Sequence, residues 1–249
     1  MLYSWLNVFF FVRMVFFWFQ FITFALKYNN MKLSSIIHTN WLATFRLNYH
    51  AGGWKAVRRL PIRVYGPLKF SLEGRLILPR DIRKNMIVFN ADHEDYTASS
   101  GKAELNIQGT WKLGGGLHIG PDCCIAVADG AFLETGADTY VGRDTQIHCY
   151  HHVSIGNGVF AGEMYVCDSA IHQLFSDGVE KTMHGQVVIG DGVYLGFRTM
   201  LLKGTVIPAR SVVGSGAICV SDYSKSGTEK LFICGNPAIV KAQDVTAKL

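Results

Sequence analysis

A six-residue repeat in the second half of the chain constrains its fold more than any other feature. Cut in sixes from Ile189 to Ser224, the sequence reads IGDGVY, LGFRTM, LLKGTV, IPARSV, VGSGAI and CVSDYS. The first position is apolar each time: Ile189, Leu195, Leu201, Ile207, Val213 and Cys219. The fifth position is small or β-branched: Val193, Thr199, Thr205, Ser211 and Ala217. A period of six fits neither the 3.6-residue period of an α-helix nor the two-residue period of a plain hairpin sheet.

The spacing inside the repeat predicts short strands joined by tight corners. The fifth position of one hexad and the first of the next lie two residues apart, so in a strand their side chains share a face. The corners favour residues that tolerate positive φ, and 20 of the 26 glycines lie between residues 101 and 220. Three hexads would close one triangular coil, and stacked coils would share backbone hydrogen bonds. The repeat therefore predicts an all-β chain folded as a parallel β-helix.

An earlier stretch shows the same unit with shifts of phase. It is marked by pairs of an apolar and a small residue, Ile119-Gly120, Ile125-Ala126, Val141-Gly142, Ile155-Gly156 and Ala161-Gly162, and by the single residues Ile147 and Cys167. We interpret the shifts, of two or four residues, as insertions at the corners.

The repeat breaks at residues 173–186, which read QLFSDGVEKTMHGQ. These residues are mostly polar and lack the hexad spacing, which resumes at Val187. Ligand sites concentrate where loops leave a rigid scaffold. His172 stands at the root of this excursion and is therefore the first candidate site residue.

Over roughly residues 105–242 the chain resembles the hexapeptide-repeat acyltransferases, whose parallel β-helix is left-handed. The segment Cys234-Gly235-Asn236-Pro237-Ala238 is similar to the Gly-Asn-Pro-Ala segment that ends their helix. Residues 56–70, AVRRLPIRVYGPLKF, resemble the entry segment of members from surface-polysaccharide gene clusters. The resemblance implies an acetyl-CoA-dependent O-acetyltransferase acting on a sugar hydroxyl of a surface-polysaccharide or nucleotide-sugar precursor. No metal is expected.

The resemblance also implies roles for particular residues. The family's catalytic histidine lies in a segment of the form Asp-x-Asp-x-His, which Asp168 and His172 match, with Ala170 in place of the second acid. A neutral imidazole, with an unperturbed pKa near ~6.5, suits the proton transfer from a hydroxyl that such a reaction needs. His172 would be the general base, and Asp168 would orient it or the sugar. Direct transfer is expected, with no Ser or Cys nucleophile.

By the same resemblance, acetyl-CoA would lie in a groove between neighbouring prisms of a homotrimer. Gly196 and Gly214 would offer backbone contacts to it, and Lys241 would approach the nucleotide phosphates. Tyr194 takes the place of an aromatic residue that is often Trp in the family. A neighbouring prism would also exclude water from the thioester.

Other histidines are weaker candidates. His184 lies inside the excursion and is the reserve base. His148, His151 and His152 cluster around Tyr150, where a solvated corner is the favoured interpretation. The Cys123-Cys124 pair and Cys167 are interpreted as packing residues, and no Cys-x-x-Cys pair indicates a zinc ribbon.

The front of the chain is cationic and apolar. Residues 1–72 carry nine Lys and Arg and no acidic residue. Between Leu2 and Leu26 the only charge is Arg13, and more than half of the residues are Leu, Ile, Val or Phe. We expect residues 1–30 to associate with a membrane, as a span or an interfacial helix, and the body to stay at the cytoplasmic face of the inner membrane. A helix that caps the body or joins subunits, and a true start at Met31, remain open.

The predicted organisation is a hydrophobic segment at 1–30, a connector and entry segment at 31–104, the β-helix at 105–224 and a tail at 225–249. The body shows no basic stripe, which argues against a nucleic-acid binder. Two other functions stay open. One is a non-enzymatic scaffold, and the other is a zinc enzyme similar to gamma-type carbonic anhydrase, although no two histidines have that family's five-residue spacing. A formyl or longer acyl donor is also open.

Overall fold

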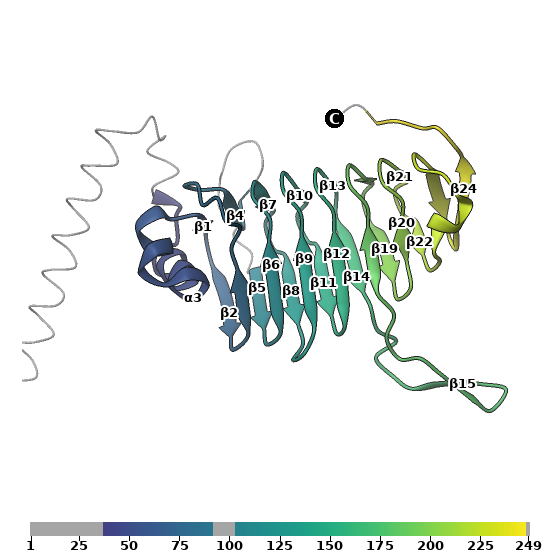
Figure 1. Cartoon of the computed structure of the whole chain (residues 1–249), viewed down its shortest axis with the longest axis horizontal. Helices are drawn as coiled ribbons and strands as arrows, with labels where there is room; N and C mark the ends of the chain where they lie inside the picture. The colour runs from purple at the N-terminus through teal and green to yellow at the C-terminus, as the bar shows by residue number, and fades with distance from the viewer. Residues whose placement is uncertain (1–36, 92–102, 248–249) are drawn as a thin grey trace, which may run out of the picture. The chain divides into compact units, whose positions relative to one another are not determined.

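Three parallel sheets form the three faces of a β-helix in the computed structural model, which describes residues 37–91 and 103–247 (Figure 1). The chain visits the sheets in turn, as in β10, β11 and β12, before it returns to the first with β13. All of these strands belong to the unit from Thr39 to Leu249. The expected apolar segment at residues 1–30 lies outside the described residues. Within the described ranges, no helix is long and apolar enough to span a bilayer.

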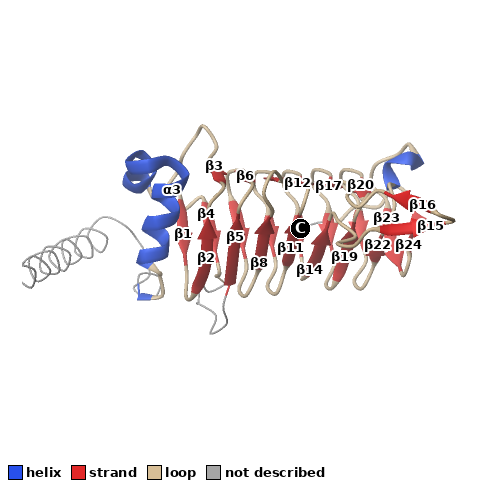
Figure 2. Cartoon of the chain, turned by 90° about the horizontal axis from the view of Figure 1, so that it is seen from below, coloured by secondary structure: helices blue, strands red, loops and turns tan. Residues whose placement is uncertain are grey.

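The first sheet has nine strands, in the order β1 (Ile62–Val64), β4 (Ile87–Phe89), β7 (Leu117–Ile119), β10 (Tyr140–Val141), β13 (Phe160–Ala161), β18 (Tyr194–Leu195), β21 (Val212–Val213), β23 (Phe232–Gly235) and β24 (Ala238–Ala242). The second has seven: β2 (Leu68–Leu72), β5 (Ala103–Ile107), β8 (Cys124–Val127), β11 (Gln146–Cys149), β14 (Met164–Cys167), β19 (Thr199–Leu202) and β22 (Ile218–Cys219). The third has six: β20 (Val206–Ile207), β17 (Val187–Ile189), β12 (His152–Ile155), β9 (Phe132–Thr135), β6 (Thr110–Leu113) and β3 (Arg75–Ile77). Figure 2 shows them from a second side.

The interior of the β-helix confirms the inward positions predicted from the hexads. Every first-position residue from Ile189 to Cys219 and every fifth-position residue from Val193 to Ala217 is at most 1% exposed. The residues between them on the strands, such as Tyr194 and Val212, are half-buried on the outside. Each strand thus contributes alternate side chains to a continuous apolar core.

The length of a coil follows from the register of neighbouring strands. Tyr194 pairs with Val212, and Met200 with Ile218, so each of these coils contains three hexads, as predicted. Nearer the N-terminus, Tyr140 pairs with Phe160, and His118 with Tyr140, so those coils are longer by two and by four residues. The longer coils account for the phase shifts in the repeat.

The glycines at the second position of the hexads are required by the stacking of coils. At one corner Gly114, Gly136, Gly156 and Gly190 follow one another along the axis, and a Cβ on Gly136 would lie 2.4 Å from the carbonyl carbon of Gly156. Gly142, Gly162, Gly196 and Gly214 recur at another corner under similar crowding. Atoms of the next coil occupy the space that a side chain would need, so these positions disfavour even alanine.

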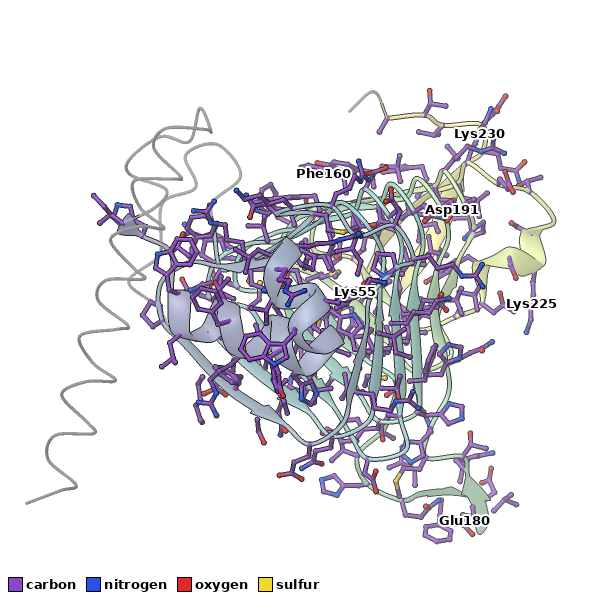
Figure 3. All side chains as sticks on the ribbon, turned by 60° about the vertical axis from the view of Figure 1, so that its left-hand side comes forward. Lys55, Phe160, Glu180, Asp191, Lys225 and Lys230 are labelled. Atoms are coloured by element: carbon purple, nitrogen blue, oxygen red, sulfur yellow. The ribbon has the colours of Figure 1, made fainter. Side chains whose placement is uncertain are left out.

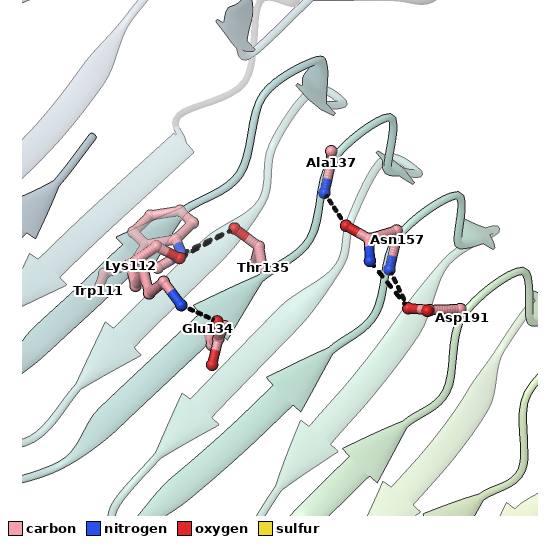
Figure 4. Close-up of polar contacts among 7 residues, drawn as sticks. All are labelled: Trp111, Lys112, Glu134, Thr135, Ala137, Asn157 and Asp191. Atoms are coloured by element: carbon pink, nitrogen blue, oxygen red, sulfur yellow. Dashed lines mark hydrogen bonds and ion pairs between the residues drawn. The ribbon is translucent and has the colours of Figure 1, made fainter. Parts of the chain in front are cut away.

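Polar side chains also join successive coils at their corners (Figure 4). Asn157 accepts a hydrogen bond from the backbone N–H of Ala137 at 2.8 Å and donates from its own backbone N–H to Asp191 at 2.7 Å. In the interior, the Trp111 indole donates to Thr135 at 3.2 Å. These bonds join one coil to the next, as the ladder between strands does.

The N-terminal end of the β-helix is covered by a helix that the sequence analysis did not predict. Helix α3 (Trp41–Arg59) buries Leu47 together with two polar residues, Thr44 and Asn48. The Asn48 side chain bonds both backbone groups of Ile62, at 2.7 and 3.1 Å, and the Thr44 hydroxyl accepts from the N–H of Val64 at 3.1 Å. The free edge of β1 is therefore satisfied by these side chains and by the backbone N–H of Asn40, which donates to the Val64 carbonyl at 2.8 Å, rather than by another coil.

Both boundaries of the predicted β-helix need correction. Strands β1 to β4 pair in register with later coils, so the β-helix begins near Ile62 and not at residue 105. Strand β1 lies within the segment predicted as a connector and entry segment. The boundary predicted at residue 225 falls inside the 3-10 helix η1 (Tyr223–Ser226), and the predicted tail contains β23, which extends the first sheet. The Gly235-to-Ala238 segment is the turn into the antiparallel strand β24.

Candidate active site

The excursion at residues 173–186 forms an antiparallel hairpin that leaves the corner between the second and third sheets. Strands β15 (Leu174–Ser176) and β16 (Val179–Lys181) pair through a turn in which Asp177 and Gly178 both have positive φ. At its root, the N–H of Ala170 donates to the backbone carbonyl of Met183 at 2.8 Å. The N–H of Gly185 donates to the backbone carbonyl of Asp168 at 2.9 Å. Glu180 marks the hairpin, which projects from the body in Figure 3. The root is closed by backbone bonds, while the tip is exposed.

Asp168 lies beneath this corner as a buried acceptor of backbone hydrogen bonds. Its carboxylate is 0% exposed and accepts from the N–H groups of Tyr150, His151 and His152, at 2.7, 2.8 and 2.6 Å. The donors belong to the corner of the preceding coil. This geometry shows a residue that holds two coils together, and the described contacts of its carboxylate do not include the His172 ring.

His172 is exposed at the root of the hairpin, directly after a strained residue. Its N–H donates to the carbonyl of Ala170 at 2.7 Å, closing a three-residue turn around Ile171. Ile171 has a φ of 66°, which is rare for a β-branched residue. The Ser169 hydroxyl accepts from the Ile171 N–H at 2.9 Å and helps to keep this conformation. Strained backbone of this kind is often kept where it positions a functional group.

The reserve base His184 lies at the same root. Its backbone forms an antiparallel bridge with Ser169, and its ring stacks on the ring of His151 at a centroid distance of 6.3 Å. Both side chains are exposed. The amide of His151 is one of the three bound by Asp168. Sequence reasoning assigned His151 to a solvated corner, and the stacking with His184 could not be derived from local spacing.

The remaining polar candidates of this region are embedded in packing. His148 and His152 are half-buried against Tyr165 and Phe132, and burial lowers the pKa of His148. Burial, assisted by the Asp168 charge, raises the pKa of the Cys149 thiol to about 12. Within the described residues, no group of three His, Cys, Asp or Glu side chains is placed to hold a metal ion.

The residues predicted to contact acetyl-CoA all belong to the first sheet or to the corner after it, away from His172. Gly196 and Gly214 follow neighbouring strands of the first sheet, and Lys241 is exposed on β24 of that sheet. The N–H of Gly196 donates to Val213 at 2.9 Å and that of Gly214 to Ile233 at 2.8 Å. Those two N–H groups therefore bond to the next coil. Acetyl-CoA could contact only other atoms of Gly196 and Gly214.

Within one chain the two groups of candidates lie at opposite ends of the strands of the second sheet. Gly196 and Gly214 are at the corner before those strands, and the excursion with His172 is at the corner after them. A four-residue strand such as β14 or β19 spans roughly 13 Å. The outer face between the corners carries Met200 and Val220, which are 38% and 45% exposed. The fold of a single chain thus does not bring all predicted site residues together.

Comparison with known proteins connects this chain to acetyl transfer through one sequence relationship. Over 173 residues it is 29% identical to the probable acetyltransferase Rv3034c of Mycobacterium tuberculosis. The match covers 66% of this chain and 53% of the relative, so the chain spans about half the length of that protein. No family model matches the chain.

The chain is also similar, at low sequence identity, to solved structures. The chain has a TM-score of 0.37 and 16% identity to the polysialic-acid-specific acetyltransferase NeuO, covering 76% of this chain and 79% of that one. The chain has a TM-score of 0.37 and 19% identity to the polysialic acid O-acetyltransferase OatWY, covering 76% of this chain and 77% of that one. It has a TM-score of 0.32 and 12% identity to a variant of AntD, an N-acyltransferase from Bacillus cereus in complex with dTDP and coenzyme A. That match covers 74% of this chain and 81% of the other. By its own strand pairing the chain is a parallel β-helix protein, and its sequence is similar to that of a probable acetyltransferase.

Proposed function

We propose that this protein is an acetyl-CoA-dependent O-acetyltransferase that acts on a sugar hydroxyl of a surface-polysaccharide or nucleotide-sugar precursor. The observation that carries the proposal is the strained turn at Ile171, which sets an exposed imidazole at the root of a closed hairpin. The similarity to a probable acetyltransferase supports the reaction class. The left-handed sense of the β-helix belongs to the same proposal.

In the proposed reaction the His172 imidazole accepts the proton of the sugar hydroxyl as the oxygen attacks the thioester carbonyl carbon. A C–O bond forms, and the tetrahedral intermediate collapses as the C–S bond breaks. The proton held by His172 passes to the departing thiolate, so the products are the acetyl ester and coenzyme A. A backbone N–H near the carbonyl oxygen would stabilise the intermediate.

Direct transfer is favoured over an acyl-enzyme because the cysteines nearest this corner are poor nucleophiles. Burial raises the pKa of Cys149 to about 12, which leaves almost no thiolate at neutral pH. Cys167 is also buried and donates to the Ser169 carbonyl at 3.3 Å. Packing accounts for both residues.

A second copy of the chain would complete the site. The acetyl-CoA contacts proposed for Gly196 and Gly214 are at one corner, and the contact proposed for Lys241 is on β24 of the same sheet. Because His172 is at another corner, a neighbouring prism would be needed to bring these residues and His172 face to face. The exposed apolar side chains of the hairpin, Phe175 at 67% and Val179 at 60%, would be covered by that neighbour. We therefore include a homotrimer in the proposal, working at the cytoplasmic face of the inner membrane, where the apolar N-terminal segment would suit a lipid-linked acceptor.

The test is release of free thiol from acetyl-CoA with a panel of nucleotide sugars and oligosaccharides. At least one acceptor should stimulate thiol release by the wild-type protein, and His172→Ala should lower that rate by a factor of about 100 or more. His184→Ala is the matched control, because His184 lies at the same root, and it should keep most of the rate. Full activity of His172→Ala would overturn the role of His172. A wild-type protein that does not bind acetyl-CoA would favour a scaffold.

A further inference from the structure

The outer face of α3 carries large apolar side chains that the fold does not use. Leu42, Tyr49 and Trp54 are 70%, 55% and 68% exposed. The opposite face of the helix is the one that packs on the β-helix, through Leu47 and its neighbours. Exposed residues of this size, gathered on one element, indicate a surface that meets a partner.

The aromatic pair on this face is held in place. The backbone angles of Gly52 and Gly53 depart from helical values, so α3 bends between Tyr49 and Trp54. The two rings lie at a centroid distance of 5.6 Å in an edge-to-face arrangement across this bend. Both rings are thus presented together at the end of the β-helix rather than scattered along the helix.

The exposed side of the helix is also cationic. Arg46, Lys55, Arg58 and Arg59 are exposed on α3, which contains no acidic residue (Lys55 is labelled in Figure 3). Residues 37–91 contain ten Lys and Arg against two Asp and Glu, whereas residues 103–247 contain nine against fourteen. Positive charge is therefore concentrated at the N-terminal end of the described body, and the remainder is slightly acidic.

We propose that the outer face of α3 docks on the surface of an anionic lipid bilayer. Trp and Tyr favour the boundary between headgroups and acyl chains, and Lys and Arg are attracted to anionic headgroups. A second copy would bring the same cationic face against itself, which repels. Nucleic acid would be attracted by the charge but would leave Leu42 without a partner. This proposal concerns residues outside those expected to bind a membrane from the sequence, and it does not depend on acetyl transfer.

The experiment measures partition of the full-length protein onto vesicles of phosphatidylcholine alone and of phosphatidylcholine with about 30% phosphatidylglycerol, whose anionic headgroups give the surface a negative potential. The test variant is Arg58→Glu with Arg59→Glu. Its control is Lys181→Glu with Lys225→Glu, which changes the net charge equally on β16 and η1. The ratio of the partition coefficient on anionic vesicles to that on phosphatidylcholine should fall by about thirtyfold or more in the test variant and stay near the wild-type value in the control. Equal ratios would overturn the proposal.

A second readout reports on Trp54 itself, whatever other part of the chain binds vesicles. Brominated phosphatidylcholine quenches tryptophans that reach the bilayer, and Trp54→Phe removes the fluorescence of this one. We expect the quenched fraction to be smaller in Trp54→Phe than in the wild type. If Trp54→Phe removes only fluorescence that brominated lipid does not quench, then Trp54 does not reach the bilayer. Another occupant, such as a second copy or residues 1–36, would then cover α3.

Discussion

Asp168 illustrates how a motif residue can serve the fold rather than the reaction. Sequence similarity to an acyltransferase motif suggested that it orients His172 or the sugar. In the structure its buried carboxylate accepts three backbone N–H groups from the corner at residues 150–152. A carboxylate suits this position because its two oxygens can accept several converging backbone N–H groups. Any effect of Asp168 on His172 would pass through the position of this corner.

We expect Asp168→Ala to destabilise the protein by more than about 3 kcal/mol, because each buried N–H left without an acceptor costs roughly 1–3 kcal/mol. Asp191→Ala is the matched control. Asp191 also accepts from a backbone N–H of an adjacent corner, at 2.7 Å, but it is exposed and water can replace it. Its loss should cost less than about 1 kcal/mol. Urea unfolding measures both, and equal free energies of unfolding would contradict this account.

At the scale of the element, the hairpin β15–β16 stands out because its apolar side chains have no role in the core. Leu174, Phe175 and Val179 are at least half exposed, and within the described residues the two strands pair only with each other. A two-stranded hairpin in water is marginally stable alone. The backbone hydrogen bonds at its root hold the hairpin to the β-helix. A neighbouring copy that covers the hairpin would account for its exposed apolar side chains.

Replacing Phe175 and Val179 together by Ser should therefore leave the free energy of unfolding of a single chain within about 0.5 kcal/mol of the wild type. If the hairpin covers a neighbour, light scattering should show a loss of oligomer mass, and acetyl transfer should fall with it. Glu180→Ser, in the same hairpin and paired with Phe175, is the control and should retain both. Unchanged mass in the double variant would remove the hairpin from the interface.

At the scale of the whole molecule, the stacking distance between coils decides which residues the corners accept. Backbone atoms of one coil lie where the Cβ of a glycine such as Gly136 in the preceding coil would be. Other glycines, such as Gly130, have open space around the Cβ position but a φ of 71°. The fold thus contains glycines of two kinds, one required by contact between coils and the other by the local backbone.

This distinction predicts different costs for two alanine substitutions. Gly136→Ala should cost about 3 kcal/mol or more, because backbone on the next coil must move to admit the methyl group. Gly130→Ala, which meets no atom within 4 Å, should cost about 1 kcal/mol from its positive φ alone. Thermal or urea unfolding would compare them. A cost for Gly136→Ala no larger than that for Gly130→Ala would show that the coils can separate locally.

Much of the fold was predictable because the repeat is local. The hexad positions, the coil length of three hexads and the site of the excursion all follow from spacing along the chain, and the structure confirms them. Helix α3 was missed because its buried face carries Thr44 and Asn48 beside Leu47, which weakens the apolar periodicity that reveals a helix. Those polar residues are buried only because β1 offers them backbone groups to bond.

What the sequence determined by itself is the β-helix, since alternate inward side chains and corner glycines are properties of consecutive residues. The position of His172 at the root of the excursion could also be inferred from the sequence. Only the tertiary structure placed Asp168 under the corner of an earlier coil, bent Ile171 into a positive φ and put the two groups of candidate residues at different corners. The position of Asp168 and the separation of the candidate residues depend on contacts between coils, which join residues a full coil apart in the sequence. The turn at Ile171 is closed by hydrogen bonds to Ser169 and Ala170 at the root of the hairpin, a conformation that the residue types alone do not specify.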